Sequence, residues 1–250
     1  MALMEQFRKQ GDFLFRYRSF FPIPFFLAGL ALHAYQQYNI ITDIPEYYYA
    51  ICFAVGLVGL YVRVLIIGYV PKGTSGRNTK EQIANTLNTD GMYSIVRHPL
   101  YVGNFLMWLG IAMITANVWF IVIFALAYWL YYERIMYAEE AFLREKFGQT
   151  YLDWAEKTPA FIPCYKKWQS PNSYFSAKNA LRREYTGLFN MVVVFFIFHF
   201  IQSAVKSNFD FTYQGIPEKV WYGILILAVI FYFTVRFLHK KTKLLEVQGR

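Results

Sequence analysis

The longest stretch of the chain without a charged residue is PLYVGNFLMWLGIAMITANVWFIVIFALAYWLYY, residues 99–132. As a single helix it would be roughly 50 Å long at about 1.5 Å per residue, which exceeds the roughly 30 Å core of a bilayer. A weak break stands at Thr115-Ala116-Asn117. We therefore expect two short apolar helices of roughly 15 residues each, which form a hairpin that turns at this tripeptide.

The composition of the whole chain fits a membrane location for this hairpin. Of the 250 residues, 56% are hydrophobic and 16% are charged, whereas about a quarter would be charged in a soluble domain. The apolar content excludes a disordered chain. Fifteen Gly and two Cys exclude a collagen and a disulfide scaffold.

Four further segments are long and apolar enough to cross a bilayer as helices, because lipid offers an unpaired backbone no hydrogen-bond partner. They are residues 20–38, 47–67, 186–205 and 220–238, and the charged residues in them are Arg63 and Arg236. Together with the hairpin they predict an all-α polytopic bundle of about six transmembrane helices. We divide the chain into a two-span region (1–70), a core with the hairpin (71–165) and a basic segment with two spans (166–250).

The basic residues predict the orientation of this bundle, since Lys and Arg avoid translocated loops. Of the 25 Lys and Arg residues, 22 fall on one side of the predicted spans, two fall on the other side, and Arg63 lies inside a span. An even number of spans then places both termini in the cytoplasm. The basic residues that give the net charge of +9 are spread over the loops on one side of the predicted spans and do not form a single patch. This distribution disfavours a nucleic-acid partner.

Two polar segments on the cytoplasmic side carry enough functional groups to form a site. The first, residues 71–99, contains several Gly, Thr and Asn residues. The second begins at Glu133, after the fourth span, and no Pro or Gly interrupts it before Gly148. The fourth span should therefore continue into the cytoplasm as a helix for about four more turns.

Each polar feature, taken alone, has a simple structural interpretation. Arg97-His98-Pro99 before a span is typical of an interfacial helix cap, and Glu139-Glu140 of a solvated helix face. Arg63 is expected to pack or to reach the interface, and His33 and His199 to be hydrogen-bonded core residues. Because Cys52 and Cys164 fall in different kinds of segment, we expect neither a disulfide nor a metal site.

Taken together, these features form a two-part pattern around the hairpin. The first part is Tyr93-x-x-x-Arg97-His98-Pro99-x-Tyr101-x-Gly103, and the second is Arg134-x-x-x-x-Glu139-Glu140-x-x-Leu143-x-x-x-Phe147-Gly148-x-x-Tyr151. At this spacing the pattern resembles the isoprenylcysteine carboxyl methyltransferase family and its phospholipid methyltransferase relatives. The resemblance covers about residues 78–163, a third of the chain.

The resemblance implies an enzyme that uses S-adenosylmethionine, releases S-adenosylhomocysteine and binds the cofactor at the cytoplasmic end of the hairpin. The cofactor residues that it implies are Asn85, Thr86, Leu87, Asn88, Tyr93, His98, Tyr101, Glu139 and Glu140. Carboxylates and aromatic faces suit the ammonium and sulfonium groups of this cofactor. The chain has no Gly-x-Gly-x-x-Gly sequence and no alternation of strands and helices, which excludes a Rossmann-type methyltransferase.

The resemblance also implies that Arg134 orients the methyl acceptor, since a guanidinium binds a carboxylate or a phosphate through two hydrogen bonds. Lys157 stands where the family often has an Arg, and we expect it to bind substrate. A carboxylate acceptor needs no general base. An amine acceptor would have to lose a proton, and His98 or Glu140 would take it.

Three functions follow from these expectations. The first is O-methylation of a carboxylate or another anionic oxygen on a lipophilic or lipid-modified acceptor, and the second is N-methylation of an aminophospholipid. The third, from another class, is a membrane protein that binds or transports a ligand without turnover. The expected partners are the acceptor and membrane lipids, without nucleic acid or metal. The expected location is the inner membrane of a bacterium or the endoplasmic reticulum of a eukaryote, with the site facing the cytoplasm.

Overall fold

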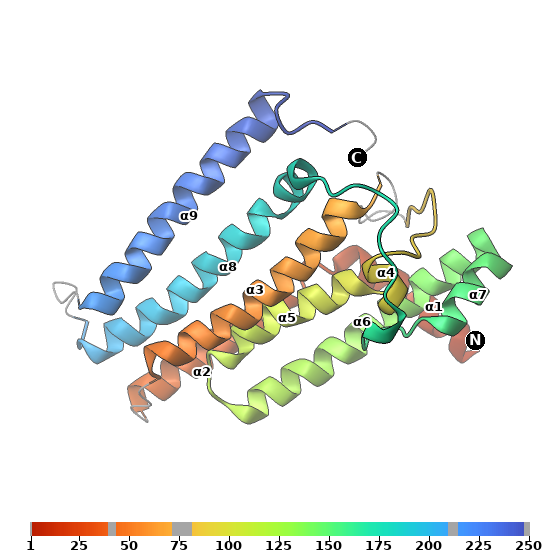
Figure 1. Cartoon of the computed structure of the whole chain (residues 1–250). Coiled ribbons are helices and arrows are strands. Elements are labelled where there is room, and N and C mark those ends of the chain that lie inside the picture. Colours follow the sequence, from red (N-terminus) through yellow and green to blue (C-terminus); the bar gives the residue numbers. More distant parts are fainter. Residues whose placement is uncertain (1, 40–43, 72–81, 210–214, 248–250) are drawn as a thin grey trace.

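The structure is a computed structural model that describes residues 2–39, 44–71, 82–209 and 215–247 (Figure 1). These residues form α1 (Leu3–Tyr17), α2 (Pro22–Asn39), α3 (Glu46–Tyr69), α4 (Met92–Ile95), α5 (Pro99–Met113), α6 (Val118–Phe147), α7 (Gln149–Lys157), α8 (Ala177–Lys206) and α9 (Ile216–Lys241), with a 3-10 turn at Tyr165–Lys167. The described part of the chain contains an isolated β-bridge between Gly91 and Gln169 but no strand. The all-α prediction is therefore confirmed. Residues 72–81 of the first polar segment lie outside the described residues.

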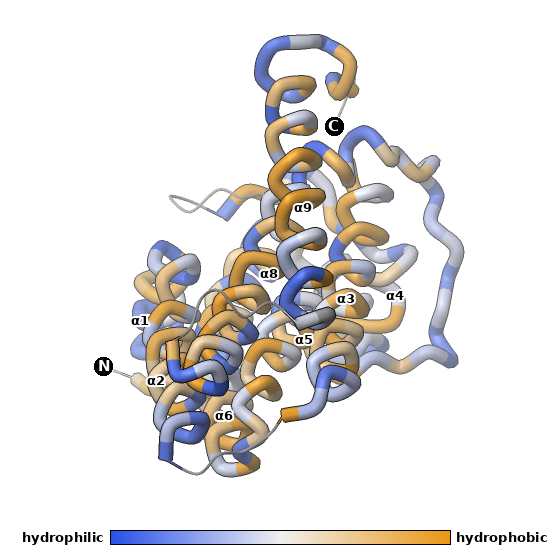
Figure 2. The backbone as a smooth tube through the Cα atoms, turned by 90° about the vertical axis from the view of Figure 1, so that its left-hand side faces the viewer, coloured by the Kyte–Doolittle hydropathy of each residue, from blue (hydrophilic) through white to orange (hydrophobic). Residues whose placement is uncertain are grey.

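The long helices follow one another across a layer in the order α9, α8, α3, α5 and α6 (Figure 1). α2 packs against α8 and α5, and α1 packs against α6. α1, α4 and α7 all lie toward the same end of the layer in Figure 1, but Figure 2 shows α1 and α4 on opposite sides of the molecule. Figure 2 shows hydrophobic residues along the helices and hydrophilic residues mainly at helix ends and in the connecting segments.

Four helices among the described residues are long and apolar enough to cross a membrane: Glu46–Tyr69, Val118–Phe147, Ala177–Lys206 and Pro217–Lys241. They correspond to the second, fourth, fifth and sixth predicted spans. The third predicted span forms the shorter apolar helix Pro99–Met113, and the first forms Pro22–Asn39, which is not among the four. The structure thus supports a membrane protein with four such helices, and the count of six remains a prediction.

The hairpin turns where the sequence predicts it. α5 ends at Met113, and α6 begins at Val118. Ala116 adopts a left-handed backbone with φ of 49°, and the Asn117 side chain accepts a hydrogen bond of 2.9 Å from the Phe120 amide. This side-chain cap satisfies one of the free amides at the start of α6.

The predicted extension of α6 is also confirmed. The helix runs without interruption to Phe147 and ends at Gly148, whose φ of 55° is readily adopted by a glycine. Glu139 and Glu140 therefore lie on the last turns of the same helix whose first turns form the apolar hairpin. The helix thus carries the acidic pair to one end of the bundle.

Close approach of α3 and α5 depends on glycines that face each other. A Cβ atom at Gly59 would lie 2.5 Å from the Gly103 carbonyl oxygen, and one at Gly110 would lie 2.5 Å from the Cys52 carbonyl oxygen. Small residues allow helix backbones to approach closely, which favours association within a membrane. These contacts fix α5 against α3 and hence the position of the site at its first turn.

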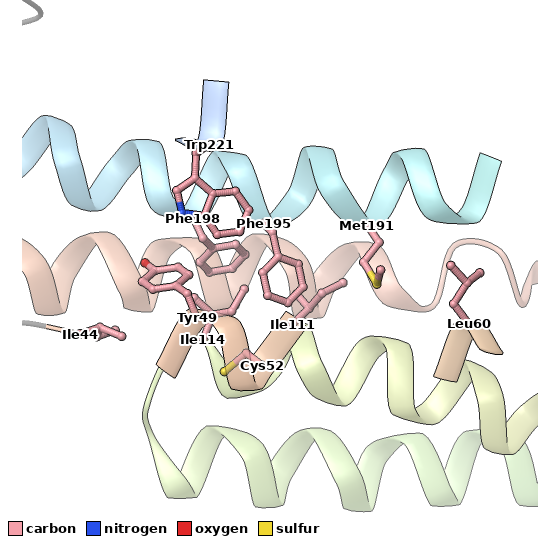
Figure 3. Packing of buried hydrophobic residues seen from close by; sticks show 10 residues of the cluster. All are labelled: Ile44, Tyr49, Cys52, Leu60, Ile111, Ile114, Met191, Phe195, Phe198 and Trp221. Carbon is pink, nitrogen blue, oxygen red and sulfur yellow. The ribbon is translucent and has the colours of Figure 1, made fainter. Parts of the chain in front are cut away.

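Aromatic and aliphatic side chains of α3, α5 and α8 fill the core beside this contact. The cluster, shown in Figure 3, comprises Ile44, Tyr49, Cys52, Leu60, Ile111, Ile114, Met191, Phe195, Phe198 and Trp221. Buried polar groups connect the same helices. His33 Nε2 lies 3.2 Å from the Phe198 carbonyl oxygen, and His199 Nε2 lies 3.1 Å from a Glu46 oxygen, so both histidines are hydrogen-bonded core residues as predicted.

We predict that Gly59→Ala destabilises the protein by about 1–3 kcal/mol, the usual cost of inserting a methyl group into a tightly packed contact. The control is Gly223→Ala on α9, where a Cβ atom would meet nothing within 4 Å. Alanine favours a helix over glycine, so this control should be neutral or slightly stabilising. Thermal unfolding in detergent measures both variants, and equal melting temperatures would contradict the α3–α5 contact.

Candidate active site

The segment before α5 is held in place by backbone hydrogen bonds to a distant segment. The amides of Arg97 and His98 donate to the carbonyl oxygens of Pro159 and Ala160 at 2.8 and 3.1 Å. The Cys164 amide donates to the Ile95 carbonyl oxygen at 2.9 Å. Because these bonds fix the backbone of His98 and of the residues before it, the His98 side chain has a defined direction at the first turn of α5.

His98 lies between the two adjacent carboxylates of α6. Its Nε2 atom is 2.9 Å from Glu140 Oε1, and its Nδ1 atom is 3.4 Å from Glu139 Oε2. Glu139 also accepts a hydrogen bond of 2.6 Å from the Tyr101 hydroxyl, and the His98 and Tyr101 rings are stacked. The structure thus brings together four predicted site residues, His98, Tyr101, Glu139 and Glu140, in a cluster that we call the acidic cluster.

Arg97 joins this cluster, although it was predicted only as part of a helix cap and of the two-part pattern, with no role in the site. Its Nε atom donates to Glu140 Oε1 at 2.9 Å, and its Nη1 atom donates to the carbonyl oxygens of Ala155 and Thr158 at 2.7 and 3.0 Å. Arg97 therefore binds Glu140 and the end of α7 at once. Its position next to His98 was the available signal, but the spacing alone does not identify the carboxylate on α6 as its partner.

The geometry favours a protonated His98. Burial alone lowers the pKa of His98, but the hydrogen bonds and negative charges of Glu139 and Glu140 outweigh burial, and the pKa of His98 is raised above its ordinary value. Both ring nitrogens face carboxylate oxygens, and only an imidazolium can donate from both nitrogens. Two cations, Arg97 and His98, then face two carboxylates.

A cavity of about 520 Å³ lies between the end of α3 and two connecting segments, and the four residues of the acidic cluster are not among its lining residues. Its lining residues are Tyr61, Leu65, Ile66, Tyr69, Val70, Pro71, Thr86, Leu87, Asn88, Thr89, Asp90, Gly91, Met92, Tyr93, Trp168, Asn172 and Ser173. Four of the predicted cofactor residues, Thr86, Leu87, Asn88 and Tyr93, line it. Asp90 and Trp168 add a carboxylate and an indole that were not predicted. Asp90 lies between the predicted residues Asn88 and Tyr93, so its position was the available signal, whereas Trp168 reaches the cavity only through the fold of a distant segment.

Tyr93 connects the cavity with the acidic cluster. Burial is the main cause that raises the pKa of the Tyr93 hydroxyl, and the negative charge of Glu139 raises it further. A hydrogen bond with the Asn88 side chain lowers this pKa. The phenol therefore lies near both Asn88 on the cavity wall and Glu139 in the cluster. The Tyr93 carbonyl oxygen accepts a hydrogen bond of 3.2 Å from the Trp154 indole.

Three predicted residues lie outside this arrangement. Asn85 is exposed and does not line the cavity. Lys157 is exposed at the end of α7, and its carbonyl oxygen accepts a hydrogen bond from Lys167. Arg134 faces α1, where it pairs with Glu133 at 2.7 Å and its guanidinium carbon lies 3.6 Å from the centre of the Phe7 ring.

The acidic cluster combines the two carboxylates of Glu139 and Glu140 with His98. Within the described ranges, no group of three or more His, Cys, Asp and Glu side chains has an arrangement suited to a metal ion. The two cysteines, buried Cys52 and half-buried Cys164, are unpaired.

Comparison with known proteins confirms the resemblance. Residues 49–150 match the family described as phospholipid methyltransferase. The chain is 38% identical to protein-S-isoprenylcysteine O-methyltransferase of Schizosaccharomyces pombe over 34% of this chain and 36% of that protein. It is 29% identical to protein-S-isoprenylcysteine O-methyltransferase B of Arabidopsis thaliana over 55% of this chain and 78% of that protein.

A bacterial protein is similar as well. The chain is 33% identical to the cobalt-zinc-cadmium resistance protein CzcN of Cupriavidus metallidurans over 46% of this chain and 56% of that protein. The chain thus spans 56% of CzcN and 36% of the S. pombe protein, less than two thirds of either relative. No solved structure matches the chain significantly.

We predict that His98 titrates above about pH 6.5, the usual pKa of histidine, and that Glu140→Gln lowers this midpoint. A group whose pKa is raised by folding stabilises the protein fully below its unfolded-state pKa, and this stabilisation is lost as the pH rises through the folded-state pKa. The wild type should therefore lose stability as the pH rises from the unfolded-state pKa of His98 to its folded-state pKa. Glu140→Gln should lose less stability over the same pH range. Nitrogen chemical shifts of the labelled imidazole measure the titration. A wild-type midpoint below about 6.5 would contradict the geometry of the acidic cluster.

Proposed function

We propose that this chain, whose residues 49–150 match the phospholipid methyltransferase family, is an integral-membrane methyltransferase that uses S-adenosylmethionine. Its acceptor is a lipophilic molecule, methylated at a carboxylate or another anionic oxygen. The observation that carries the proposal is an aromatic cavity among membrane-type helices whose lining residue Tyr93 interacts with Glu139 of the acidic cluster. The predicted bias of basic residues supports a cytoplasmic location for that end.

The chemistry of the lining residues fits the cofactor. The cavity volume of about 520 Å³ falls within the range of roughly 300–1,000 Å³ for small-molecule sites. Tyr61, Tyr69, Tyr93 and Trp168 supply aromatic faces for a cation, and Asp90 supplies a carboxylate. When bound, S-adenosylmethionine supplies an electrophilic methyl group on a sulfonium, and its ammonium and ribose hydroxyls suit acceptor oxygens.

The residues of the acidic cluster have separate roles in this proposal. Glu139 contributes a negative charge beside Tyr93 and thereby favours a cationic ligand in the cavity. Glu140 holds His98 and Arg97, so it positions the start of α5. For an anionic oxygen acceptor no proton has to move, and catalysis rests on proximity and orientation.

The names of the relatives and of the family point to two different classes of acceptor. The names of the S. pombe and A. thaliana proteins indicate O-methylation of isoprenylcysteine. The family description indicates a phospholipid substrate, which favours the alternative, N-methylation of an aminophospholipid. In that case Glu140 would accept the proton that the amine loses, because the protonated His98 of the acidic cluster has no free lone pair to accept one. Arg134 and Lys157 are the proposed contacts with an anionic group of the acceptor.

Glu139→Gln is expected to weaken S-adenosylmethionine binding about tenfold or more, the equivalent of about 1.4 kcal/mol, because the variant removes a half-buried negative charge near a cationic ligand. The matched control is Glu145→Gln on the same helix, whose carboxylate forms an exposed pair with Arg8. Isothermal titration of the purified protein in detergent measures both variants. Equal affinity of wild type and Glu139→Gln would exclude Glu139 from the cofactor site.

The methyl acceptor can be classified with membranes incubated with methyl-labelled cofactor. We expect the label in the lipid fraction to be released by mild base, as a carboxyl methyl ester is. Arg134→Ala should lower kcat/KM about tenfold without changing cofactor affinity, since it removes a contact with the acceptor. Arg144→Ala, an exposed change on the same helix, serves as the control. Label that resists base would favour N-methylation and contradict the ester.

A further inference from the structure

A second hollow, which we call the α8 groove, lies on the other side of α3 from the cavity. Its volume is about 240 Å³. The groove is lined by Leu60, Val64, Phe175, Ala177, Ala180, Leu181, Glu184, Tyr185, Leu188 and Phe231. These residues belong to α3, α8, α9 and the segment before α8, and all three helices are long and apolar enough to cross a membrane. The groove therefore lies among membrane-type helices.

The carboxylate in the groove wall, that of Glu184, is already neutralised by an ion pair. Glu184 receives two hydrogen bonds of 2.8 Å from Arg63 Nε and Nη2, and Arg63 Nη1 donates to Asn104 Oδ1 at 2.5 Å. Arg63 is thus a packing residue in a bidentate buried ion pair, which agrees with the sequence expectation. With this carboxylate compensated, the lining of the groove presents almost entirely carbon and suits a hydrocarbon chain.

The groove and the cavity share a wall. On α3, Leu60 and Val64 face the groove, whereas the residues that follow each of them, Tyr61 and Leu65, face the cavity. The segment before α8 is divided in the same way, because its residues 172 and 173 line the cavity and Phe175 lines the groove. A thin wall of side chains therefore separates the two hollows.

Phe175 forms the part of this wall nearest the end of α3. Its ring lies against Gly68, where a Cβ atom would overlap it, and meets the Tyr69 ring edge-on with centres 5.3 Å apart. The Ser176 amide donates to the Gly68 carbonyl oxygen at 2.8 Å and fixes the segment on α3. Phe175, which lines the groove, therefore contacts Tyr69, which lines the cavity, and an aromatic side chain can move without a change in the fold.

We propose that the α8 groove binds the hydrocarbon chain of the methyl acceptor and directs the polar end of the acceptor past Phe175 toward the cavity. The inference rests on the proposed function, since the cavity has to hold the methyl donor. It also assigns a role to α8 and α9, which lie beyond the matched residues 49–150. These two helices then select the acceptor by the length and shape of its chain.

The experiment uses S-farnesyl-cysteine that carries a diazirine in its chain and the full-length protein in detergent. After irradiation, mass spectrometry should locate the label on α8 residues of the groove and on Phe231. Unlabelled S-farnesyl-cysteine should compete, and cysteine without the chain should not. Cofactor affinity is measured on the same preparation, so that the site for the methyl donor is tested separately.

Two tryptophan variants distinguish the groove from general contact with lipid. Leu181→Trp fills the groove and should reduce groove labelling about tenfold, because a ring then occupies the space of several methylene groups. Leu227→Trp on α9 is the control, since Leu227 is 68% exposed and does not line the groove. Phe231→Ala is an independent test that keeps the proposal testable if Leu181→Trp does not fold. It enlarges the groove and should therefore increase labelling.

The possible outcomes separate the two proposals. The inference is supported if the label is confined to the groove, if unlabelled S-farnesyl-cysteine prevents this labelling, and if the cofactor binds. Cofactor binding with label spread over the exposed residues of α9 overturns the groove and leaves the proposed function standing. Groove labelling without cofactor binding overturns the proposed function, and with it the assignment of the bound chain as a methyl acceptor.

Discussion

The placement of two adjacent carboxylates beside a buried histidine is the constraint on which the end of the bundle depends. Half-buried Glu139 and Glu140 are unfavourable unless cations and donors surround them, and Arg97, His98 and Tyr101 supply these groups. The partners lie at the start of α5, while the acids lie near the end of α6. Their pairing therefore fixes the extension of α6 beside the start of α5, and Arg97 fixes the end of α7 to the same point.

The apolar part of the molecule serves this arrangement by holding α5 close to α3. Glycine contacts between these helices allow an approach that larger residues would prevent. The cavity lies at the end of α3, and the acidic cluster lies at the first turn of α5, so the distance between the two helices sets the relation between cavity and cluster. A water-soluble methyl donor and a lipophilic acceptor can meet at such a place, where a polar site borders membrane-type helices.

Much of this architecture is local and could be predicted from the sequence. The turn at residues 115–117 and the run of α6 to Gly148 follow from the apolar pattern and the helix breakers, whereas the common site of His98 and the acidic pair was implied by the family resemblance. The bidentate pair of Arg63 with Glu184 joins residues 121 positions apart, and no spacing rule identifies such partners. For the same reason the contribution of Trp168 to the cavity and the packing of Arg134 against α1 emerged only from the fold.

The central claim is that the cavity beside the acidic cluster binds the methyl donor. The most direct test is ultraviolet cross-linking of methyl-labelled S-adenosylmethionine to the purified protein, followed by mapping of the labelled peptide. The account predicts label on residues 86–93, which line the cavity, and loss of this label with excess S-adenosylhomocysteine. Label that maps to α8 or α9, or label that S-adenosylhomocysteine does not displace, would contradict it.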